Sequence, residues 1–593
     1  MTPVAARVDA VDGADRAQLA PAPVDDVRSQ ARDPAGWLSA HRMVSLAAVL
    51  GLLWPEFKAW SDIVSAPLPG LTTIALTGAT LVLACLIAAA TSEEALERLD
   101  RWLLALGLLV LVAWVSSGMR SSSGYSTDEA AFVHGAASLL LHGHDPYGAN
   151  LLPSLARFGV PSKFWTYTMS GGTVSTFGYP AFQLLVAVPF VALFPNGQAV
   201  VFAEILALGV AIALTFAFLP RRWRSLAVLL CVGFPALETF VLAGLNVVLM
   251  LPALLVVARR WAHVGEGGRL ARQDCVAAIA LGLAVSTSQL GWFIAPFILL
   301  GIVLLRAQRL GSTRALALSG RYAGLAALTF LVLNAPFIVW GPSAWWHGVA
   351  APLSQHALPY GQGLIGLTAF LGLGGGAVDA YTYAAVALYL GLLALFAVHF
   401  RSLARCCFLF PAVALFASGR SLSEYWLVLV APIVIGAISA DGVSLRAAVD
   451  FRPSLLRRRA TAKAVSAALF APAAALLAVA LLVPAPLSIR VLKTQMNQPD
   501  TAVVRLWVAV RNRTGAPLRP HFAINSTGQA SPFWRIVNGP AVLAGGAQAR
   551  YVLGVTDVDP ADSGPFRLEA VTGSPRTISS SAVIRPRLTF QEG

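Results

Sequence analysis

Two adjacent carboxylates, Asp128 and Glu129, begin a stretch of the chain that is rich in ionisable side chains. The stretch, residues 125–148, reads YSTDEAAFVHGAASLLLHGHDPYG and also holds three histidines and Asp145. It follows an apolar run at 102–118, so the acids fall at the level of the membrane surface. Ionisable groups at that depth are costly unless they pair or line an aqueous site, which makes the cluster a candidate functional site. The alternative is an ordinary loop whose acids are solvated.

The residues around the acids predict an amphipathic helix that holds them. Ser126 or Thr127 suits the N-cap position, and both acids then fall in the first helical turn. The apolar face of this helix would contain Ala131, Val133, Ala137, Leu140 and Leu141. We expect the helix to lie flat on the membrane and to hold its acids at the lipid surface. Farther along, His142, His144 and Asp145 are too few fixed ligands for zinc, so we predict neither a metal nor another cofactor.

The rest of the chain is dominated by apolar runs. Of its 593 residues, 57% are hydrophobic and 12% are charged, whereas a soluble domain has about a quarter of its residues charged. This composition indicates a mainly α-helical, polytopic membrane protein with about 13 transmembrane helices, each of roughly 15 to 25 residues. The expected spans are 43–60, 71–90, 102–118, 198–219, 226–242, 244–258, 275–287, 289–305, 319–338, 376–399, 404–418, 425–440 and 464–485.

Clusters of basic residues between the runs predict the orientation. Although the net charge is +14, Lys and Arg lie in short clusters between the apolar runs, which is typical of cytoplasmic loops, and we predict no nucleic-acid binding. The clusters are Arg221, Arg222 and Arg224; Arg259, Arg260, Arg269 and Arg272; Arg306, Arg309 and Arg314; Arg401 and Arg405; and Arg446, Arg452, Arg457, Arg458, Arg459 and Lys463. All fall inside if a disordered tail at 1–40 is cytoplasmic and the apolar helix at 179–194 does not cross the membrane. The long loops at 119–178 and 339–375 are then external.

The segment after residue 486 has a different pattern. TAVVRLWVAVRNRTGAPLRPHFAIN alternates apolar and polar residues with a period of two and breaks at turn-forming residues. We therefore predict a membrane domain at 41–486 and a small extracytoplasmic β-sandwich at 490–593, in a multi-pass protein of the plasma (inner) membrane. Four aromatic residues near the expected turns of the sandwich either stack on sugar or fill its core. They are Trp507, Phe522, Phe533 and Trp534.

The external loop and later segments carry motifs of a known family. The acidic pair is followed by F…A…LL..G..PY and a later YP, and the matching residues are Asp128, Glu129, Phe132, Ala136, Leu139, Leu140, Gly143, Pro146, Tyr147, Tyr179 and Pro180. AGLNVVLMLPALLVVARR keeps Gly244 and Asn246 of a Gly-Gln-Asn-type span, NAPFIVWGPSAWWHGVAAPLSQHALPYGQGL is a second external loop, and GRSLSEYWLVLVAP supplies Arg420 and Tyr425. In this order the motifs resemble the GT-C superfamily of membrane glycosyltransferases, which includes polyprenyl-phosphate-mannose-dependent mannosyltransferases, actinobacterial arabinosyltransferases and protein O-mannosyltransferases.

The resemblance implies an inverting transfer of a sugar, mannose or arabinose, from a polyprenyl-phosphate donor embedded in membrane lipid. The acceptor would be a hydroxyl of an envelope glycan, a glycolipid or a protein on the outer face. Asp128 matches the general base, and Glu129 would orient it or bind the acceptor. Arg420 lies at the outer end of a span, where arginine is costly without an anionic partner, and suits the departing phosphate.

Further roles follow from the same resemblance. His347 and His356, in the second external loop, would bind the donor phosphate together with Arg420. The residues expected to bind substrate are His144, Asp145, Tyr147, Tyr179, Glu238, Asn246 and Tyr425. Plain structural roles remain open, including an interfacial arginine, surface histidines and, for Glu238, an interhelical hydrogen bond. The lysine that the family often has where STSQLGWF stands is absent.

Two other classes of protein remain possible. A transporter or flippase of lipid-linked envelope precursors would have inverted repeats and acids within broken spans near the midplane, and no repeat is visible in the sequence. A scaffold that displays the exported domain gives no reason for Asp128 or Arg420 at the membrane surface.

The predicted orientation can be tested with reporter fusions. Because excess Lys and Arg stay cytoplasmic, we expect reporters placed after residue 593 or near residue 350 to be active only outside the cytoplasm. Fusions between residues 262 and 270 should report the opposite side. A cytoplasmic signal from either of the first two positions would overturn the orientation.

Overall fold

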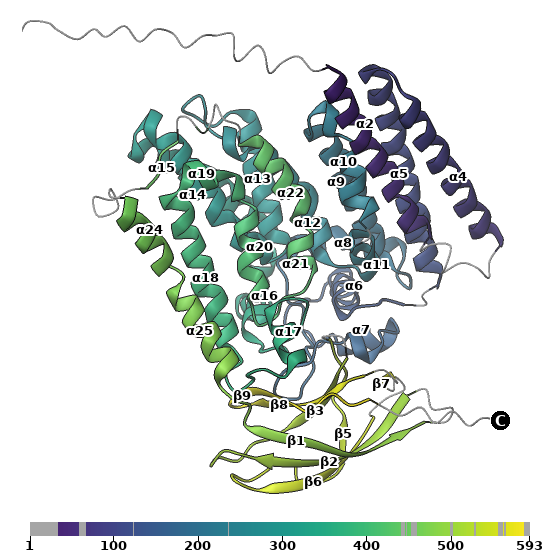
Figure 1. Cartoon of the computed structure of the whole chain (residues 1–593), viewed down its shortest axis with the longest axis vertical. Coiled ribbons are helices and arrows are strands. Elements are labelled where there is room, and N and C mark those ends of the chain that lie inside the picture. The colour runs from purple at the N-terminus through teal and green to yellow at the C-terminus, as the bar shows by residue number, and fades with distance from the viewer. Residues whose placement is uncertain are drawn as a thin grey trace, which may run out of the picture.

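The computed structural model describes most of the chain. The described residues are 34–57, 67–121, 124–234, 236–440, 445, 448–451, 459–497, 502–526, 529–555, 561–562 and 565–585. Residues 1–33 of the expected tail lie outside them, as do Arg446, Arg452, Arg457 and Arg458 of the last basic cluster. Within these ranges a large helical region is followed by two β-sheets at one end of the molecule (Figure 1).

Eight described helical stretches are long and apolar enough to cross a membrane. They are Gly36–Phe57, Leu71–Ala89, Glu93–Arg120, Ala199–Phe218, Leu290–Leu310, Ser312–Trp340, Asp379–Val398 and Lys463–Leu482. The corresponding elements are α2 (Pro34–Gly51), α4 (Pro67–Ala89), α5 (Glu93–Ser121), α9 (Ala199–Phe218), α14 (Leu290–Leu310), α15 (Ser312–Trp340), α18 (Asp379–Val398), α24 (Arg459–Ala468) and α25 (Ala471–Leu482). This finding supports the predicted polytopic membrane protein.

The expected number of 13 spans is not confirmed. A ninth span results if the pair Leu226–Gly233 and Ala236–Ala243, bent by 49°, is one broken span. The other expected spans are helices shorter than 18 residues. They are α12 (Asn246–Arg260), α13 (Arg272–Thr287), α20 (Leu409–Phe416), α21 (Glu424–Leu427) and α22 (Val430–Ser439).

The remaining helical elements are short and lie in the connections between the longer helices. They are α6 (Asp128–Leu141), α7 (Leu152–Arg157), η1 (Ser162–Phe164), α8 (Ala181–Leu193), η2 (Arg221–Trp223), α10 (Leu226–Val228), η3 (Leu229–Gly233), α11 (Ala236–Ala243), η4 (Trp261–His263), α16 (Pro342–Ser354), α17 (Leu364–Leu371), α19 (Phe400–Leu403) and η5 (Ala404–Cys406). The helix predicted at 179–194 is α8, with 13 residues. Its non-crossing role stays a prediction.

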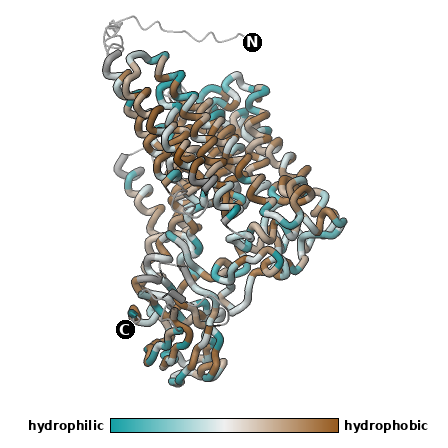
Figure 2. Tube along the Cα trace, turned by 90° about the vertical axis from the view of Figure 1, so that its right-hand side faces the viewer, coloured by the Kyte–Doolittle hydropathy of each residue, from teal (hydrophilic) through white to brown (hydrophobic). Residues whose placement is uncertain are grey.

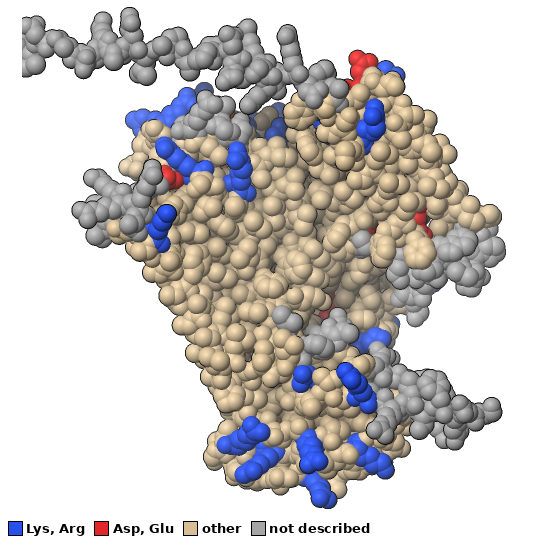
Figure 3. Space-filling model, viewed as in Figure 1, with Lys and Arg blue, Asp and Glu red and all other residues tan. Residues whose placement is uncertain are grey.

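The two ends of the helical region differ in character. Figure 2 shows a largely hydrophobic body with hydrophilic residues at its ends. At one end lie α6, α7, α16 and α17, close to the sheets (Figure 1). At the other end, Figure 3 shows Lys and Arg side chains gathered on the visible face. The external loops and the basic clusters expected in the cytoplasm thus lie at opposite ends, although the direction of the molecule across a membrane stays a prediction.

Helix α6 has the predicted start but not the predicted surroundings. Thr127 is its N-cap, and the Thr127 hydroxyl accepts from the Ala130 N–H at 3.3 Å. Every residue from 130 to 137 is buried, so the helix does not lie flat on the lipid surface as expected. Small residues let neighbouring segments approach on all sides: a Cβ added to Gly135 would lie 2.2 Å from the Ser154 hydroxyl oxygen, and α8 and α9 also pack against the helix.

The C-terminal strands form two antiparallel sheets around their own apolar core. One sheet has the order β1 (Leu487–Met496), β2 (Ala502–Asn512), β6 (Gln548–Gly554) and β5 (Arg535–Asn538), with β7 (Ala561–Asp562) also paired to β2. The other has the order β4 (Gln529–Ala530), β3 (His521–Ser526), β8 (Arg567–Gly573) and β9 (Arg576–Ser580). A C-terminal β region is thereby confirmed. Phe522 and Trp534 fill its core, so of the four aromatic residues only Trp507 and Phe533 remain partly accessible.

The second sheet rests on the external loops of the membrane domain. The Ile578 N–H donates to the Gly375 carbonyl oxygen at 2.9 Å, and Arg576 forms a 2.7 Å ion pair with Asp379 at the start of α18. The ring of Phe533 lies edge-on to Tyr167, with centroids 5.4 Å apart. The sheet region and the loop near residue 167 therefore form one continuous packed unit.

Candidate active site

Asp128 and Arg420 are brought together by a residue that lies between them, Thr166. The Thr166 N–H donates to Asp128 Oδ2 at 2.6 Å, and the Thr166 hydroxyl accepts from Arg420 at 3.3 Å. Asp128 and Arg420 are half-buried and interact through their charges, but they form no direct ion pair. A negative and a positive group thus contact the same residue, Thr166, at the end of the membrane domain that carries the sheets.

Glu129 occupies a separate set of hydrogen bonds. Tyr179 donates its hydroxyl to Glu129 Oε2 at 2.7 Å, and the backbone N–H of Asn246 donates to Oε1 at 2.7 Å. Asn246 is the first residue of α12, so the positive end of that helix points at the carboxylate. The side chain of Gln183 lies 3.5 Å from Oε1 and also accepts from the Asn246 amide. Three predicted residues, Glu129, Tyr179 and Asn246, are therefore in contact.

The two carboxyl groups have raised pKa values. Burial raises the pKa of Asp128 above its usual value, while its hydrogen bonds to Thr166 and the charge of Arg420 limit the rise. Burial also raises the pKa of Glu129 to about 7. The hydrogen bonds from Asn246 and Tyr179 lower that pKa, and the nearby acids Glu424 and Asp128 raise it. Both carboxyl groups therefore lose their protons at a higher pH than solvated carboxyl groups do.

A tight backbone contact fixes the position of Arg420. The Ser421 N–H donates to the Tyr360 carbonyl oxygen at 3.2 Å, and Gly361 pairs with Ser421 as a parallel β-bridge. A Cβ added to Gly361 would lie 2.2 Å from the Ser421 carbonyl oxygen, so only glycine allows this approach. Arg420 then donates to the Tyr360 hydroxyl at 3.3 Å and lies over the Tyr360 ring at 5.0 Å.

Further ionisable groups surround the acidic pair. Tyr425 and Glu424, at the start of α21, interact electrostatically with Arg420 and Glu129. Glu204 of α9 is buried and lies close enough to Glu129 for their charges to interact. Tyr425 was expected here from the sequence. The contribution of Glu424 was not.

Several polar residues hold the segment that carries Tyr179. Tyr147 is buried and donates its hydroxyl hydrogen to the Tyr179 carbonyl oxygen at 2.9 Å, which fixes the backbone of this segment. Gln289 donates to the carbonyl oxygens of Gly178 and Val349 at 2.8 and 2.7 Å. Gln289 belongs to STSQLGWF, the place where the family's lysine is absent, and its amide is used for this backbone anchor.

Other predicted residues make contacts away from this cluster. His347 bonds to Ser343 one turn earlier on α16, and His356 contacts Arg576 of the second sheet. His144 is exposed, and Asp145 accepts from the Tyr147 N–H at 2.9 Å within its own turn. Glu238 is fully buried on α11, and neither of its carboxyl oxygens has a hydrogen-bond partner in the described part of the chain.

Thr166, Tyr360 and Gln183 join the site without having been predicted from the sequence. Thr166 and Tyr360 lie in irregular external loops that have no periodic pattern, and Gln183 lies inside an apolar helix. Of the three, only Gln183 could have been noticed in the sequence, because an amide side chain within an apolar helix indicates a buried hydrogen-bond partner.

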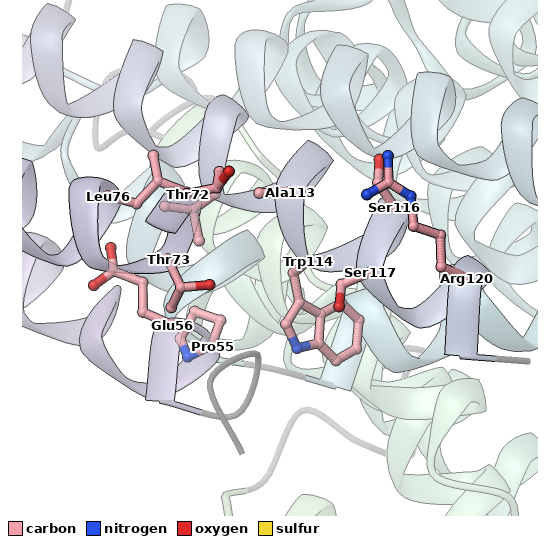
Figure 4. A pocket seen from close by; sticks show the side chains of 11 residues that line it. Pro55, Glu56, Thr72, Thr73, Leu76, Ala113, Trp114, Ser116, Ser117 and Arg120 are labelled. Atoms are coloured by element: carbon pink, nitrogen blue, oxygen red, sulfur yellow. The ribbon is translucent and has the colours of Figure 1, made fainter. Parts of the chain in front are cut away.

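Two cavities in the described part of the chain lie outside this cluster. One, of about 160 Å³, lies among α2, α4 and α5 and is lined by Glu56, Thr72, Thr73, Trp114, Ser117 and Arg120, among others (Figure 4). The other, of about 370 Å³, lies between α17, α18, α25 and the strands β1 and β9. None of their lining residues is a predicted site residue.

The arrangement of Asp128, Arg420 and Glu129 has a definite chemical capacity. A carboxylate of raised pKa is a stronger base than a solvated one and can accept a proton from a hydroxyl group. A guanidinium fixed by two oxygen atoms can hold an anion such as a phosphate. The site therefore combines a base and an anion-binding group a short distance apart.

Comparisons with known proteins give little further guidance. No family model matches the chain, and no curated protein matches it. Among solved structures, it is similar to ArnT from Cupriavidus metallidurans in the apo state, with 15% identity and a TM-score of 0.34 over 57% of this chain and 59% of that one. The same protein bound to undecaprenyl phosphate gives 16% identity and a TM-score of 0.34 over 57% and 60%. The chain thus spans less than two thirds of these structures, and similarity at this level carries no argument about fold or function.

The pKa of Glu129 can be measured directly. We expect infrared titration of the carboxyl C=O band to show a group that is protonated below a midpoint of about pH 7 and ionised above it, and this component should be missing from Glu129→Gln. Tyr179→Phe removes a donor to the carboxylate, so it should raise the midpoint by roughly one pH unit. The exposed Tyr383 provides the control Tyr383→Phe, which should leave the midpoint unchanged. An unchanged midpoint in Tyr179→Phe would contradict the described contact.

Proposed function

We propose that this protein is a membrane glycosyltransferase that moves a sugar from a polyprenyl-phosphate donor to an acceptor hydroxyl on the outer face. The sugar is mannose or arabinose, and the acceptor is an envelope glycan, a glycolipid or a protein. The observation that carries the proposal is the half-buried pair of Asp128 and Arg420, which face one another across Thr166. The protein would lie in the plasma (inner) membrane with its N-terminus in the cytoplasm.

In the proposed reaction Asp128 is the general base. The acceptor oxygen attacks the anomeric carbon while Asp128 takes the hydroxyl proton, and the bond from that carbon to the phosphate oxygen breaks. The bonding electrons leave with the polyprenyl phosphate, whose added negative charge Arg420 stabilises. Attack on the face opposite the leaving group inverts the anomeric configuration. Asp128 returns to its ionised form when the proton passes to water.

Glu129 is assigned a supporting role in this scheme. Its hydrogen bonds to Tyr179 and Asn246 hold it in one position, and its pKa of about 7 leaves it partly protonated near neutral pH. A neutral Glu129 would reduce repulsion of the ionised Asp128, and it would still accept or donate a hydrogen bond to an acceptor hydroxyl. In this role Glu129 takes no proton, and Asp128 is the single base of the reaction.

Substrate contacts are assigned to the side chains nearest Asp128 and Arg420. Tyr425 interacts electrostatically with Arg420, and we assign its hydroxyl a contact to the donor phosphate. His347 and His356 remain proposed phosphate ligands only if their side chains leave Ser343 and Arg576. The isoprenoid chain of the donor would lie among the apolar helices, whose outer surfaces carry exposed large hydrophobic residues.

A transporter of lipid-linked envelope precursors is the second candidate. The observation that favours it is a buried acid, Glu238, on the bent pair of helices at 226–243. Transfer of sugar by protein purified in detergent would decide between the two, because no membrane separates two compartments there and transport cannot contribute.

Replacement of the proposed base provides the first functional test. Asp128→Asn keeps the shape of the side chain and its acceptor oxygen for Thr166 but cannot take a proton, so we expect sugar transfer to fall by roughly 10² or more with donor binding nearly unchanged. The matched control is Asp450→Asn, because Asp450 accepts from the Arg401 N–H at 2.9 Å and an amide oxygen can do the same. Near-normal turnover of purified Asp128→Asn would refute the assignment and make Glu129 the next candidate.

Removal of residues 490–593 tests whether the C-terminal domain positions the acceptor. The domain contributes no described residue to the contacts of Asp128, so we expect the truncated protein to show a raised KM for the acceptor and to retain hydrolysis of the donor. Circular dichroism and gel filtration would establish that the helical part is still folded. Loss of donor hydrolysis as complete as in Asp128→Asn would mean that the domain supplies part of the active site.

A further inference from the structure

The outer surface of the first sheet carries a dense group of positive charges. Side chains alternate between the two faces of a strand, and in β2 the residues 506, 508 and 510 are buried in the core. Residues 505, 507, 509 and 511 therefore point away from the core, together with their partners on β1 and β6. We call the six exposed cations at these positions and on β5 the basic face. They are Arg490, Lys493, Arg505, Arg511, Arg535 and Arg550.

The register divides the basic face into two groups. Arg490 and Arg550 both pair with Ala509, from opposite sides of β2, and Arg511 lies two residues along. The flanking strands are thus about 10 Å apart, and Arg511 is about 7 Å further along the sheet. Lys493 pairs with Trp507, while Arg535 and Arg505 both pair with Gly554. At these spacings, comparable to a Debye length of about 8 Å at physiological salt, the positive potentials of neighbouring side chains add.

The basic face is not neutralised in the described part of the chain. None of the six cations forms an ion pair with a described carboxylate, and the described outward positions of β1, β2 and β6 hold no acid. Figure 3 shows Lys and Arg gathered over β1, β2 and β6, with no Asp or Glu in view there. On an ordinary soluble surface, positive and negative side chains are interspersed, so a surface with only positive ones suggests a binding role.

The basic face points away from the membrane domain. Ile578 and Arg576 of the second sheet contact the external loops, as does Phe533 between β4 and β5. In the first sheet the start of β1, residues 487–489, lines the cavity beside α17, α18 and α25. The two sheets enclose a common core and packed sheets are about 10 Å apart, so the first sheet turns its outer surface in the opposite direction. The bilayer that holds this protein is therefore not the surface that these cations meet.

An aromatic residue lies among the cations. Trp507 is half-buried in the middle of the sheet, and Lys493 Nζ lies 5.1 Å from the centre of its ring. Val552 flanks Trp507 on β6, which extends the apolar patch. A flat apolar patch surrounded by cations matches a polymer that alternates sugar rings with negative groups.

We propose that the basic face binds an anionic polysaccharide, one that carries carboxylate or phosphate groups, outside the membrane. The arginines pair with the anionic groups and the patch at Trp507 receives a sugar ring. The choice of a polysaccharide rests on the proposed orientation, which places the sheets outside the cytoplasm. The site is separate from the acidic pair and does no chemistry, so it goes beyond the transfer reaction proposed above.

The test uses full-length protein in nanodiscs of neutral lipid, with polygalacturonate as the anionic probe and dextran as the neutral one. We expect binding of polygalacturonate but not of dextran, and a Kd that rises by at least about tenfold between low and high salt because surface charges are screened. The triple variant Arg490→Gln, Arg511→Gln, Arg550→Gln should weaken binding by at least about tenfold. The same three positions changed to Lys keep the charge and should retain most of the affinity.

Each other outcome would overturn the proposal. Equal binding of the Gln and Lys variants would show that these positions do not hold the polymer. Tighter binding of a single-stranded polynucleotide of equal charge would assign the face to nucleic acid. Both variants should hydrolyse the donor as the unmodified protein does, so failure of the transfer reaction and failure of this binding site are read out separately.

Discussion

The backbone N–H of Thr166 donates to Asp128 while its hydroxyl accepts from Arg420, and this one residue keeps two opposite charges close but apart. Removing a charge from water is costly unless fixed hydrogen bonds replace the lost hydration. Here Thr166 and Tyr360 supply such bonds without closing the ion pair. Because the two groups are not paired with each other, both remain available for the acceptor and the donor phosphate of the proposed reaction. A direct ion pair would occupy both groups with each other.

Three segments far apart in the sequence must be fixed for Asp128, Thr166 and Arg420 to meet. The cap of α6 fixes Asp128, since the Thr127 hydroxyl also donates to the Ala243 carbonyl oxygen and ties α6 to the end of α11. The close approach of Gly361 to Ser421 fixes Arg420. The loop that carries Thr166 contacts the C-terminal domain, where Phe533, between β4 and β5, lies edge-on to Tyr167. The domain thus touches this loop but places no described residue in contact with Asp128.

Local patterns in the sequence predicted the long helices and the start of α6, although the expected number of spans is not confirmed. The apolar runs predicted every long helix, and the order Thr-Asp-Glu predicted the start of α6, because capping depends on residues a few positions apart. The surroundings of α6 could not be predicted in this way. Its small residues were consistent with a surface helix, and only the packing of α8 and α9 shows that they serve close contact.

The site residues also divide into those that a local motif indicates and those that only long-range contacts bring together. Asp128, Glu129, Tyr179 and Arg420 stand in recognisable motifs, whereas Thr166 and Tyr360 join the site through contacts between distant loops. The proposed role of His347 and His356 in binding phosphate stays a prediction. His347 bonds within its own helix, and His356 meets an arginine from the C-terminal domain.

The outer surface of the first sheet carries cations that are unpaired within the described residues, whereas the proposed active site combines the carboxylate of Asp128 with a single cation, Arg420. In the proposed scheme this difference matters, because Arg420 is used by the donor phosphate and the ionised Asp128 would repel a polyanion that came directly to it. The cations on the outer sheet hold such a polymer at a distance from the acids, so electrostatics favour the approach of an uncharged, hydroxyl-bearing part of a chain to Asp128. The negative groups of the polymer stay where the arginines are. The domain would then use charge alone to select which part of an acceptor reaches the base. It would need no contact with the reacting sugar.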